Sequence, residues 1–555
     1  MRKIASTLFL FALLGICHVD VLAQSRPRQE RTQTLRQAPP IPRLVSENGK
    51  HTLLVDGQPF LILGAQLWNS SGWPGILDKT WPQLRELNCN TLEVPIYWEQ
   101  IEPQPGQYDF SILDKLILDA RRENLRLVLL WFASFKNGQS QYVPAWVKEN
   151  TQEYPRMLDG TGRPIQVLST LSEKNRNADA RAFAAVMAHI RQMDETHRTV
   201  IMMQPENEPG SLGTDRDYSP AATKLFNYQV PAKLVSALKK QPGTWAQVFG
   251  PEAAEAFSAY HMASYINYIA EAGKKEYPLP MYVNAWIREN RFGRAGEHPS
   301  GGPTSNMLDI YKVAGPSIDL LAVDIYHRNY MQFRDLCEKY GRPDNALFIP
   351  ETGRGISFAR FHFYAIGDYN AIGVAPYGID PFHADPHDKR DKEKLDNKFA
   401  GIAANYRLLR PAIPLITRLQ KEGKLKAAAE EDGLGDELMH FGKYDLLLTY
   451  GFPSYREGKE MTGRVLVGET GPDEFILIGF DTKFQFRPKL GSGFSSAEFI
   501  SVEEGTFENG TWKKIRNWNG DEVYHSTLTP EGVILKVKLR GLQSDKLDTK
   551  PNFER

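Results

Sequence analysis

Two glutamates that each follow a predicted strand are the side chains best placed to do chemistry in this chain of 555 residues. Glu208 stands in Gln204–Gly210 (QPENEPG), and Glu351 follows the apolar run Leu347–Pro350. They are 351 − 208 = 143 residues apart, which is about three strand-and-helix units of a barrel. Two carboxyl groups that face each other can cleave a glycosidic bond with retention, because one protonates the leaving oxygen while the other attacks the anomeric carbon.

Glu206 competes with Glu208 for the catalytic role, because residues i and i+2 of a strand point to the same side. The pair Asn207-Glu208, followed three strands later by a strand-end glutamate, resembles the clan of (β/α)8 glycosidases that retain configuration. That resemblance implies that Glu208 is the acid/base and that Glu351 is the nucleophile. It also implies that Asn207 holds the sugar 2-hydroxyl.

A (β/α)8 TIM barrel is the fold that would bring these glutamates together, since its reacting groups stand at the carboxyl ends of the strands. Short apolar runs alternate with amphipathic stretches such as Ile112–Glu123 and Ala178–His197, and Asn397–Leu409 begins the last predicted helix. The eight predicted strands are Phe60–Ala65, Thr91–Pro95, Arg126–Trp131, Val200–Gln204, Met281–Asn284, Leu320–Asp324, Leu347–Pro350 and Gly373–Ala375.

The chain divides into four predicted segments. Residues 1–23 carry Arg2 and Lys3 before a short apolar run, which predicts a cleaved signal peptide. Residues 24–45 are polar and rich in proline, which predicts a disordered linker. Residues 46–425 hold the barrel, and the short alternating runs within 426–555 predict an antiparallel β-sandwich domain.

The charge balance and the N-terminal sequence indicate which partner and which location to expect. Lys+Arg and Asp+Glu both number 67, so no net field attracts nucleic acid, and a neutral carbohydrate is the expected partner. The apolar run near the N-terminus is too short for a membrane span. We therefore expect export to the periplasm or the outside of the cell, with lipidation at Cys17 or a membrane anchor as alternatives. Oligomeric state is left open.

Several segments resemble glycoside hydrolase family 35 over roughly residues 50 to 380. The acid/base segment Gln204–Gly210 is similar to that family's, with Pro209 where the family usually has tyrosine. Further similar segments are LVDGQPF with GAQ at 54–66, EPQPGQYDF at 102–110 and PAW at 144–146. The resemblance implies an exo-acting retaining β-D-galactosidase whose barrel is followed by one compact β domain.

Other residues bear on the sugar pocket. Pro95–Pro103 is two residues longer than the family 35 pattern and resembles family 42 there. Asn137 falls where many relatives carry a glutamate that binds galactose hydroxyls, and Tyr377 matches a tyrosine that lines the pocket. Tyr326, after the sixth strand, can donate to the nucleophile or simply pack under a loop. Three tryptophans can stack on sugar rings or pack in the core: Trp68, Trp131 and Trp286.

The mechanism needs no cofactor, and no metal is expected. His383, Asp385, His387 and Asp388 match no common ligand spacing and are interpreted as a solvated loop. Two alternatives to a family 35 β-galactosidase stay open: another retaining glycosidase, such as a β-glucosidase, a family 42-like β-galactosidase or a β-mannanase, and a non-catalytic carbohydrate-binding barrel. Xyloglucan is a candidate natural substrate.

Overall fold

The computed structural model describes residues 38–290, 292–380, 399–431, 435–450 and 461–543. The described residues from Pro39 onward belong to one compact unit. The predicted signal peptide lies outside the described residues, as does most of the predicted linker. Strand β1 (Arg43–Glu47) begins inside the segment 24–45 that was expected to be disordered, because it pairs antiparallel with β2 (Lys50–Val55).

The predicted (β/α)8 barrel is confirmed. Eight parallel strands follow the order β10-β11-β12-β13-β4-β5-β6-β9, and a bridge between Met203 and Met281 joins the last strand to the first. Each strand coincides with one predicted run. They are β4 (Ile62–Gln66), β5 (Thr91–Tyr97), β6 (Arg126–Lys136), β9 (Val200–Asn207), β10 (Tyr282–Ala285), β11 (Leu320–Ile325), β12 (Phe348–Thr352) and β13 (Gly373–Pro376).

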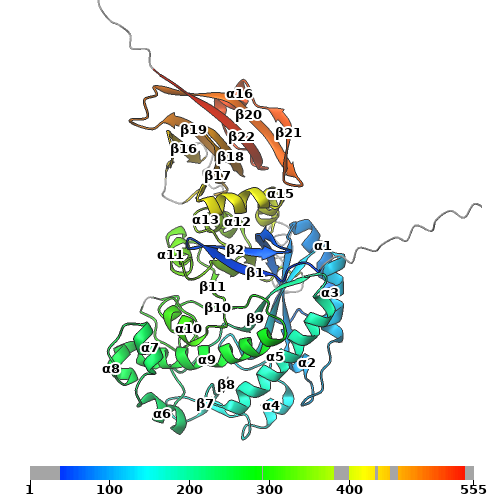
Figure 1. Cartoon of the computed structure of the whole chain (residues 1–555), viewed down its shortest axis with the longest axis vertical. Helices are drawn as coiled ribbons and strands as arrows, with labels where there is room; N and C mark the ends of the chain where they lie inside the picture. The colour runs from blue at the N-terminus through cyan, green and yellow to red at the C-terminus, as the bar shows by residue number, and fades with distance from the viewer. Residues whose placement is uncertain (1–37, 291, 381–398, 432–434, 451–460, 544–555) are drawn as a thin grey trace, which may run out of the picture. The chain divides into compact units, whose positions relative to one another are not determined.

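Helices cover the outside of the barrel (Figure 1). Apolar residues three and four apart give each helix one buried side, as Leu113, Leu116, Ile117 and Ala120 do in α3. The helices α5 and α9 lie side by side along the barrel. The outer helices are α1 (Pro74–Leu87), α3 (Ser111–Arg122), α5 (Glu173–Asp194), α9 (Ala253–Glu276), α10 (Leu308–Ala314), α11 (Tyr330–Tyr340), α13 (Phe361–Gly367) and α15 (Ala400–Glu422).

Shorter elements lie within the connections between the barrel strands and their outer helices. Two of them, α6 and α8, begin with a side-chain cap; in α8 the Thr244 side chain accepts from the backbone N–H of Gln247. These elements are α2 (Trp98–Ile101), α4 (Ala145–Glu149), β7 (Arg156–Leu158), β8 (Pro164–Leu168), α6 (Pro220–Phe226), α7 (Ala232–Ala237), α8 (Trp245–Phe249), η1 (Gly250–Glu252) and α12 (Ile356–Ala359).

A small antiparallel sheet of β1, β2 and β3 (Gln58–Phe60) precedes the first barrel strand. Leu53 and Val55 of β2 are buried in one cluster with side chains from the barrel strands. Several of these residues come from the amino-terminal part of their strands, whereas the predicted catalytic residues Glu208 and Glu351 lie at carboxyl ends. The strand residues of the cluster are Ile62, Tyr97, Val128, Leu130, Phe132, Ile201, Met202, Tyr282, Leu320, Ala322 and Phe348.

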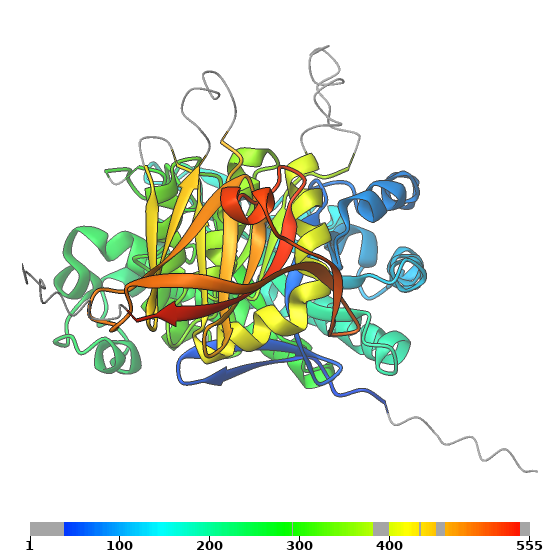
Figure 2. The same ribbon diagram turned by 90° about the horizontal axis from the view of Figure 1, so that it is seen from above.

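The predicted β-sandwich after the barrel is confirmed as two antiparallel sheets (Figure 2). Alternate residues of a strand face opposite ways: Val465 and Val467 enter the sandwich core, while Leu466 joins the barrel's core cluster. One sheet holds β14 (Leu425–Ala429), β17 (Arg464–Gly471), β18 (Glu474–Phe480), β22 (Val533–Leu542), β20 (Ser496–Glu508) and β21 (Thr511–Asn517), and the other holds β15 (Glu437–Phe441), β16 (Tyr444–Tyr450) and β19 (Thr482–Pro488).

Barrel helices and the first sandwich strands are joined by hydrogen bonds as well as apolar contacts. Ala427 donates its backbone N–H to Asp368 at 2.9 Å, and buried Arg464 donates to Asn405 at 2.7 Å. The short helix α16 (Asp521–His525) precedes β22. The expected boundary between residues 425 and 426 stays a prediction, and Leu425, Ala427 and Leu466 of the first sandwich strands belong to the barrel's core cluster. Among the described residues, no helix is both long and apolar enough to cross a membrane.

Candidate active site

A cavity of about 310 Å³ opens at the carboxyl ends of the barrel strands. It brings together the two predicted catalytic glutamates and three of the four predicted substrate-binding residues. The lining residues are Lys136, Asn137, Glu208, Trp286, Ile287, Glu289, Asp324, Tyr326, Glu351 and Tyr377. Asn207, the fourth predicted substrate-binding residue, is fully buried directly beside this cavity and donates to Glu351.

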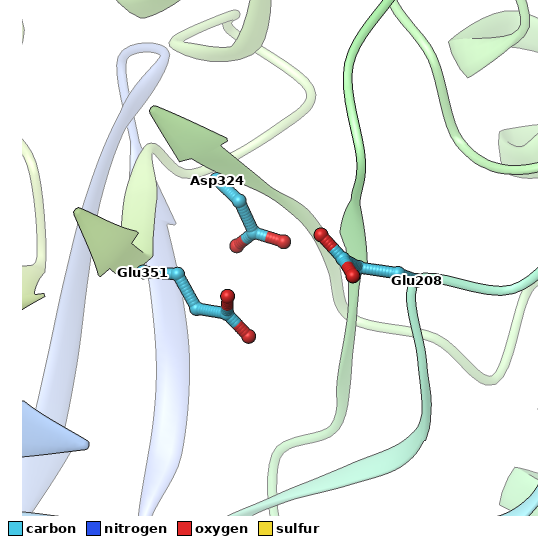
Figure 3. Close-up of side chains that lie close together, drawn as sticks. All are labelled: Glu208, Asp324 and Glu351. Carbon is cyan, nitrogen blue, oxygen red and sulfur yellow. The ribbon is translucent and has the colours of Figure 1, made fainter. Parts of the chain in front are cut away.

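Three carboxyl groups converge in this cavity from different elements (Figure 3). Glu208 follows β9, Asp324 lies in β11 and Glu351 lies in β12. One carboxylate oxygen from each lies within 4.8 Å of the others, and all three side chains are buried. Glu208 and Glu351, which are 143 positions apart in the sequence, are therefore close in space, as expected for a barrel.

The chain leaves β9 through an unusual backbone path. Glu206 and Glu208 have φ angles of +68° and +42°, in the left-handed region that non-glycine residues seldom occupy. Such residues cost about 1–3 kcal/mol each and are held by their surroundings. Here the backbone N–H of Glu208 donates to Asn284 Oδ1 at 2.9 Å. This path breaks the strand alternation, so Glu206 and Glu208 face different surroundings.

Glu206 is fully buried behind the cavity, on the side of β6. Its two oxygens accept from the backbone N–H groups of Ser134 (3.3 Å) and Phe135 (2.5 Å), and its carboxyl group hydrogen bonds to that of Asp179 in α5. Burial and the negative charge of Asp179 raise the pKa of Glu206 well above its ordinary value. The carboxyl groups of Glu206 and Asp179 thus contact each other in the core, away from the cavity.

Hydrogen-bond donors surround Glu351. Its Oε1 accepts from Gln66 Nε2 at 2.9 Å and from Asn207 Nδ2 at 3.3 Å, with Asn284 Nδ2 at 3.5 Å. Its Oε2 accepts from the Tyr326 hydroxyl at 3.1 Å, the contact that the sequence suggested for this tyrosine. Because donors stabilise a carboxylate, this arrangement suits an ionised nucleophile.

Glu208 lies in a different electrostatic setting. Burial, followed by the negative charge of Glu351, raises the pKa of Glu208 to about 7. The positive charge of Lys136 and a hydrogen bond with Asp324 act in the opposite direction. Asp324 also has a raised pKa, through burial and the charges of both glutamates. Below neutral pH Glu208 therefore carries the proton that an acid catalyst needs.

Lys136, at the end of β6, fixes the orientation of Asn207. Its Nζ donates to Asn207 Oδ1 at 2.6 Å. Since the amide oxygen is held by the lysine, the amide nitrogen must face Glu351. The buried ammonium group therefore both orients an amide beside the nucleophile and stabilises negative charge in the cavity.

Of the remaining predicted residues, Asn137, Tyr377 and Trp286 line the cavity and Trp131 does not. Asn137 has a left-handed φ of +52°, and its buried side-chain oxygen has no partner among the described residues. Tyr377 packs edge-to-face on Trp68, with ring centroids 5.0 Å apart. Trp286 lines the cavity, whereas Trp131 is fully buried and donates to Asp179 at 2.8 Å, so only the former can meet a sugar.

Among the residues that were not predicted from the sequence, four act on the two glutamates or on Asn207: Gln66, Lys136, Asn284 and Asp324. Each is a polar residue at or near the carboxyl end of a barrel strand. That position was the available signal, because polar side chains there face the site in this fold. Their pairing with particular oxygens depends on the strand order and could not be read from spacing.

The three carboxyl groups also meet the spacing of a metal site. However, Lys136 already lowers the pKa of Glu208 and Asp324, and amide nitrogens of Asn207 and Asn284 approach Glu351 Oε1. N–H donors and an ammonium group suit hydrogen bonding and proton transfer better than cation coordination. The predicted solvated loop containing His383 and Asp388 lies outside the described residues.

Two family models match the chain. Residues 68–264 match the glycoside hydrolase family 42 model, described as β-galactosidase, and residues 402–529 match a domain of unknown function, DUF5597. A curated β-galactosidase of Xanthomonas manihotis is 28% identical over 178 residues, which cover 29% of this chain and 26% of that protein. The chain thus matches about a quarter of the length of this relative.

Two β-galactosidases are among the solved structures that are similar to the chain. The β-galactosidase of the psychrophilic Marinomonas ef1 has a TM-score of 0.45 at 15% identity, covering 65% of this chain and 61% of that one. The cold-adapted β-galactosidase of Rahnella sp. R3 also has a TM-score of 0.45 at 15% identity, covering 64% and 57% of the two chains.

The family 35 resemblance is corrected by the family match. The model that matches residues 68–264 is that of family 42, and this region includes the acid/base segment Gln204–Gly210 on which the family 35 assignment mainly rested. The Asn-Glu pair is common to the wider clan, so it could not separate the two families. The segment Pro95–Pro103, which spans the end of β5 and helix α2, was the part whose sequence pointed to family 42.

Proposed function

We propose that this chain is a retaining β-galactosidase that removes terminal galactose by double displacement. The observation that carries the proposal is the pair Glu208 and Glu351 in one cavity, with carboxylate oxygens within 4.8 Å. Retaining enzymes place their carboxyl groups about 5–5.5 Å apart, and inverting enzymes roughly 6.5–9.5 Å apart. The match of residues 68–264 to a β-galactosidase family supports galactose as the sugar.

In the first step Glu351 attacks the anomeric carbon while the bond to the leaving oxygen breaks. Glu208, protonated up to about pH 7, donates its proton to that oxygen. The products are a galactosyl ester of Glu351 and a free alcohol. Asn207, held by Lys136, presents its amide beside the nucleophile, where it can bind the sugar 2-hydroxyl as charge develops on the ring.

In the second step Glu208, now ionised, takes a proton from water as the water oxygen attacks the anomeric carbon. The ester bond to Glu351 breaks, and the carboxylate returns to its four hydrogen-bond donors. Because both steps invert the anomeric carbon, galactose leaves with the β configuration. Both protonation states of Glu208 are accessible near neutral pH.

The substrate and location are further parts of the proposal. The predicted signal peptide at residues 1–23 supports action outside the cytoplasm, in the periplasm or beyond. We accordingly propose an oligo- or polysaccharide with terminal β-galactose, with galactosylated xyloglucan as one candidate.

Hydrolysis of 4-nitrophenyl glycosides tests the activity directly. We expect the β-galactoside to have a higher kcat/KM than the β-glucoside, β-mannoside and α-arabinoside. NMR of the reaction in its first minutes should show β-galactose before it mutarotates. Preference for another sugar would favour a different glycosidase of the clan, α-galactose as the first product would exclude the double displacement, and binding without turnover would favour a carbohydrate-binding barrel.

A further inference from the structure

A second cavity of about 640 Å³ adjoins the first and shares Tyr326 and Tyr377 with it. Its other lining residues follow β4, β11 and β12, on the side of the barrel away from β9. They are Trp68, Arg328, Gly353, Arg354, Gly355 and Phe358. The catalytic carboxyl groups do not line this cavity, so it is the place for a part of the substrate that does not react.

We propose that this second cavity binds an oxyanion, a sulfate ester or a carboxylate, carried by the reacting sugar on the side away from its leaving group. The proposal rests on the proposed glycosidase function and narrows its substrate class. Its basis is a pair of arginines, Arg328 and Arg354, in a cavity that would otherwise receive only neutral hydroxyl groups.

Neither arginine has a carboxylate partner within 4.0 Å among the described residues. Arg354 is half-buried, donates to the carbonyl oxygen of Gly378 at 3.0 Å and lies over the Trp68 ring at 5.5 Å. Arg328 is exposed and lies over the Phe358 ring at 5.5 Å. A guanidinium group has five N–H donors in a planar fork that matches two oxygens of an oxyanion, so most of its donors here are left for a ligand.

The surrounding chain fixes the position of the Trp68 ring beside Arg354. Gly378 has a φ of +72°, and a Cβ there would lie 2.7 Å from Trp68 Cε2. Only glycine therefore lets this chain segment approach the indole so closely. The backbone N–H of Trp68 donates to the buried carboxylate of Asp380 at 2.9 Å, which holds the ring between Tyr377 and Arg354.

The position of the acid/base decides which part of the substrate enters the second cavity. Glu208 must reach the leaving oxygen, so the leaving group lies on the side of β9. Besides Glu208, Glu351 and Lys136, the charged residues that line the first cavity are Asp324 and Glu289. Glu289 follows β10, lies 3.6 Å from His327 and would repel an anionic leaving group. The two cavities therefore differ in charge. The second cavity, which holds the two arginines, receives the part of the sugar that lies away from the leaving group.

Kinetics on matched nitrophenyl substrates test the proposal. The substrates are 4-nitrophenyl β-D-galactoside, its 3-O-sulfate, its 6-O-sulfate and 4-nitrophenyl β-D-galacturonide, which share one leaving group. We expect at least one anionic substrate to exceed the neutral one in kcat/KM by about tenfold, the size of one hydrogen bond to a charged group. The sulfates and the uronide separate the two sources of the oxyanion. Galactosyl-β-1,4-glucuronic acid should show no advantage over lactose, because its charge is on the leaving side.

Two variants of Arg354 separate charge from packing. Arg354→Gln should lower the anionic-to-neutral ratio of kcat/KM by about tenfold. Arg354→Lys keeps a positive charge and should hold the ratio above one. Equal kcat/KM for all four substrates in the wild type, or an equal loss on neutral and anionic substrates in Arg354→Gln, would overturn the proposal.

Calorimetry makes the outcome independent of turnover. The wild-type protein should bind D-galactose 3- or 6-sulfate or D-galacturonate more tightly than D-galactose, and the preference should weaken as salt is raised. If no galactoside is hydrolysed but this preference is seen, the proposed function fails and the anion site stands. If galactosides are hydrolysed and no anion is preferred, the anion site alone fails.

Discussion

Two acidic pairs lie on either side of one strand end, and we propose different roles for them. Glu206 pairs with Asp179 in the core, while Glu208 faces Glu351 across the cavity. Both Glu206 and Glu208 have raised pKa values, and burial is the main cause in each. A raised pKa therefore does not distinguish Glu208, the proposed catalytic acid, from Glu206.

The difference lies in what each carboxyl group can reach. Glu206 is bonded on all sides, to the backbone of Ser134 and Phe135 and to Asp179, whose other partners include Trp131. Such a satisfied network stabilises one arrangement of the core. Glu208 borders a cavity, so a substrate oxygen can approach it. Access to a ligand therefore separates the proposed chemical pair from the structural one.

Replacing Glu351, the proposed nucleophile, should cause the largest loss of activity. Glu351→Ala cannot form the galactosyl ester, so kcat/KM should fall by roughly 10⁴-fold or more. A better leaving group should not restore activity, since the missing atom is the one that attacks. Near-normal turnover of a dinitrophenyl galactoside by this variant would remove Glu351 from the mechanism.

Replacing the acid/base should have a large effect that depends on the leaving group. Glu208→Ala should still be galactosylated by a nitrophenyl substrate and then stall, with turnover lower by roughly 10²–10⁴-fold. Azide needs no general base, so it should restore turnover and yield the β-galactosyl azide, identified by NMR. Glu206→Ala is the matched control two residues away and should show no azide rescue. Rescue of Glu206→Ala instead would reverse the roles of the two residues.

Removing the cation of the site should have a moderate effect with a distinct pH signature. In Lys136→Met, Asn207 loses its 2.6 Å partner, and we expect kcat/KM to fall roughly ten- to hundredfold. Lys136 lowers the pKa of Glu208, so its removal should move that pKa above about 7 and shift the basic limb of the pH–rate profile to higher pH.

Lys136→Arg is the control for that shift, because it keeps the positive charge. Its basic limb should stay near the wild-type position, even if activity is reduced by altered geometry. A basic limb that moves equally in Lys136→Met and Lys136→Arg would show that charge is not the cause.

Changing the structural pair should have the smallest effect on catalysis. Glu206→Gln replaces a protonated carboxyl by an amide that can donate to Asp179 and accept from Phe135, so kcat/KM should change by less than about tenfold. The expected signature is in stability. Because the pKa of Glu206 is raised in the folded state, its contribution is full below its ordinary pKa of about 4.5 and is lost as pH rises toward the folded value.

Thermal unfolding between pH 4 and pH 9 measures that contribution. Wild-type stability should decline toward alkaline pH by up to about 1.4 kcal/mol per pH unit for this proton, and Glu206→Gln should show a shallower decline. Parallel Tm curves for the two proteins would mean that the pair does not hold a proton in the folded state.

The sequence alone determined the barrel. Eight apolar runs alternate with helical stretches, and this alternation is typical of parallel strands covered by helices. It also brought Glu208 and Glu351 to one face, since all strands of a barrel end on the same side. The alternating runs after residue 430 likewise determined a sandwich. The family 35 assignment from the sequence was wrong, because the Asn-Glu motif belongs to a whole clan.

Only the tertiary structure decided which acid faces which. Glu206 turns away from Glu208 because both residues take left-handed backbone angles, which strand periodicity does not predict. Lys136 and Asp324 enter the site through the order of strands around the barrel, where β6 neighbours β9 and β11 neighbours β12. Hydrogen bonds and charges act over a few ångströms, so they depend on this spatial order and not on distance along the chain.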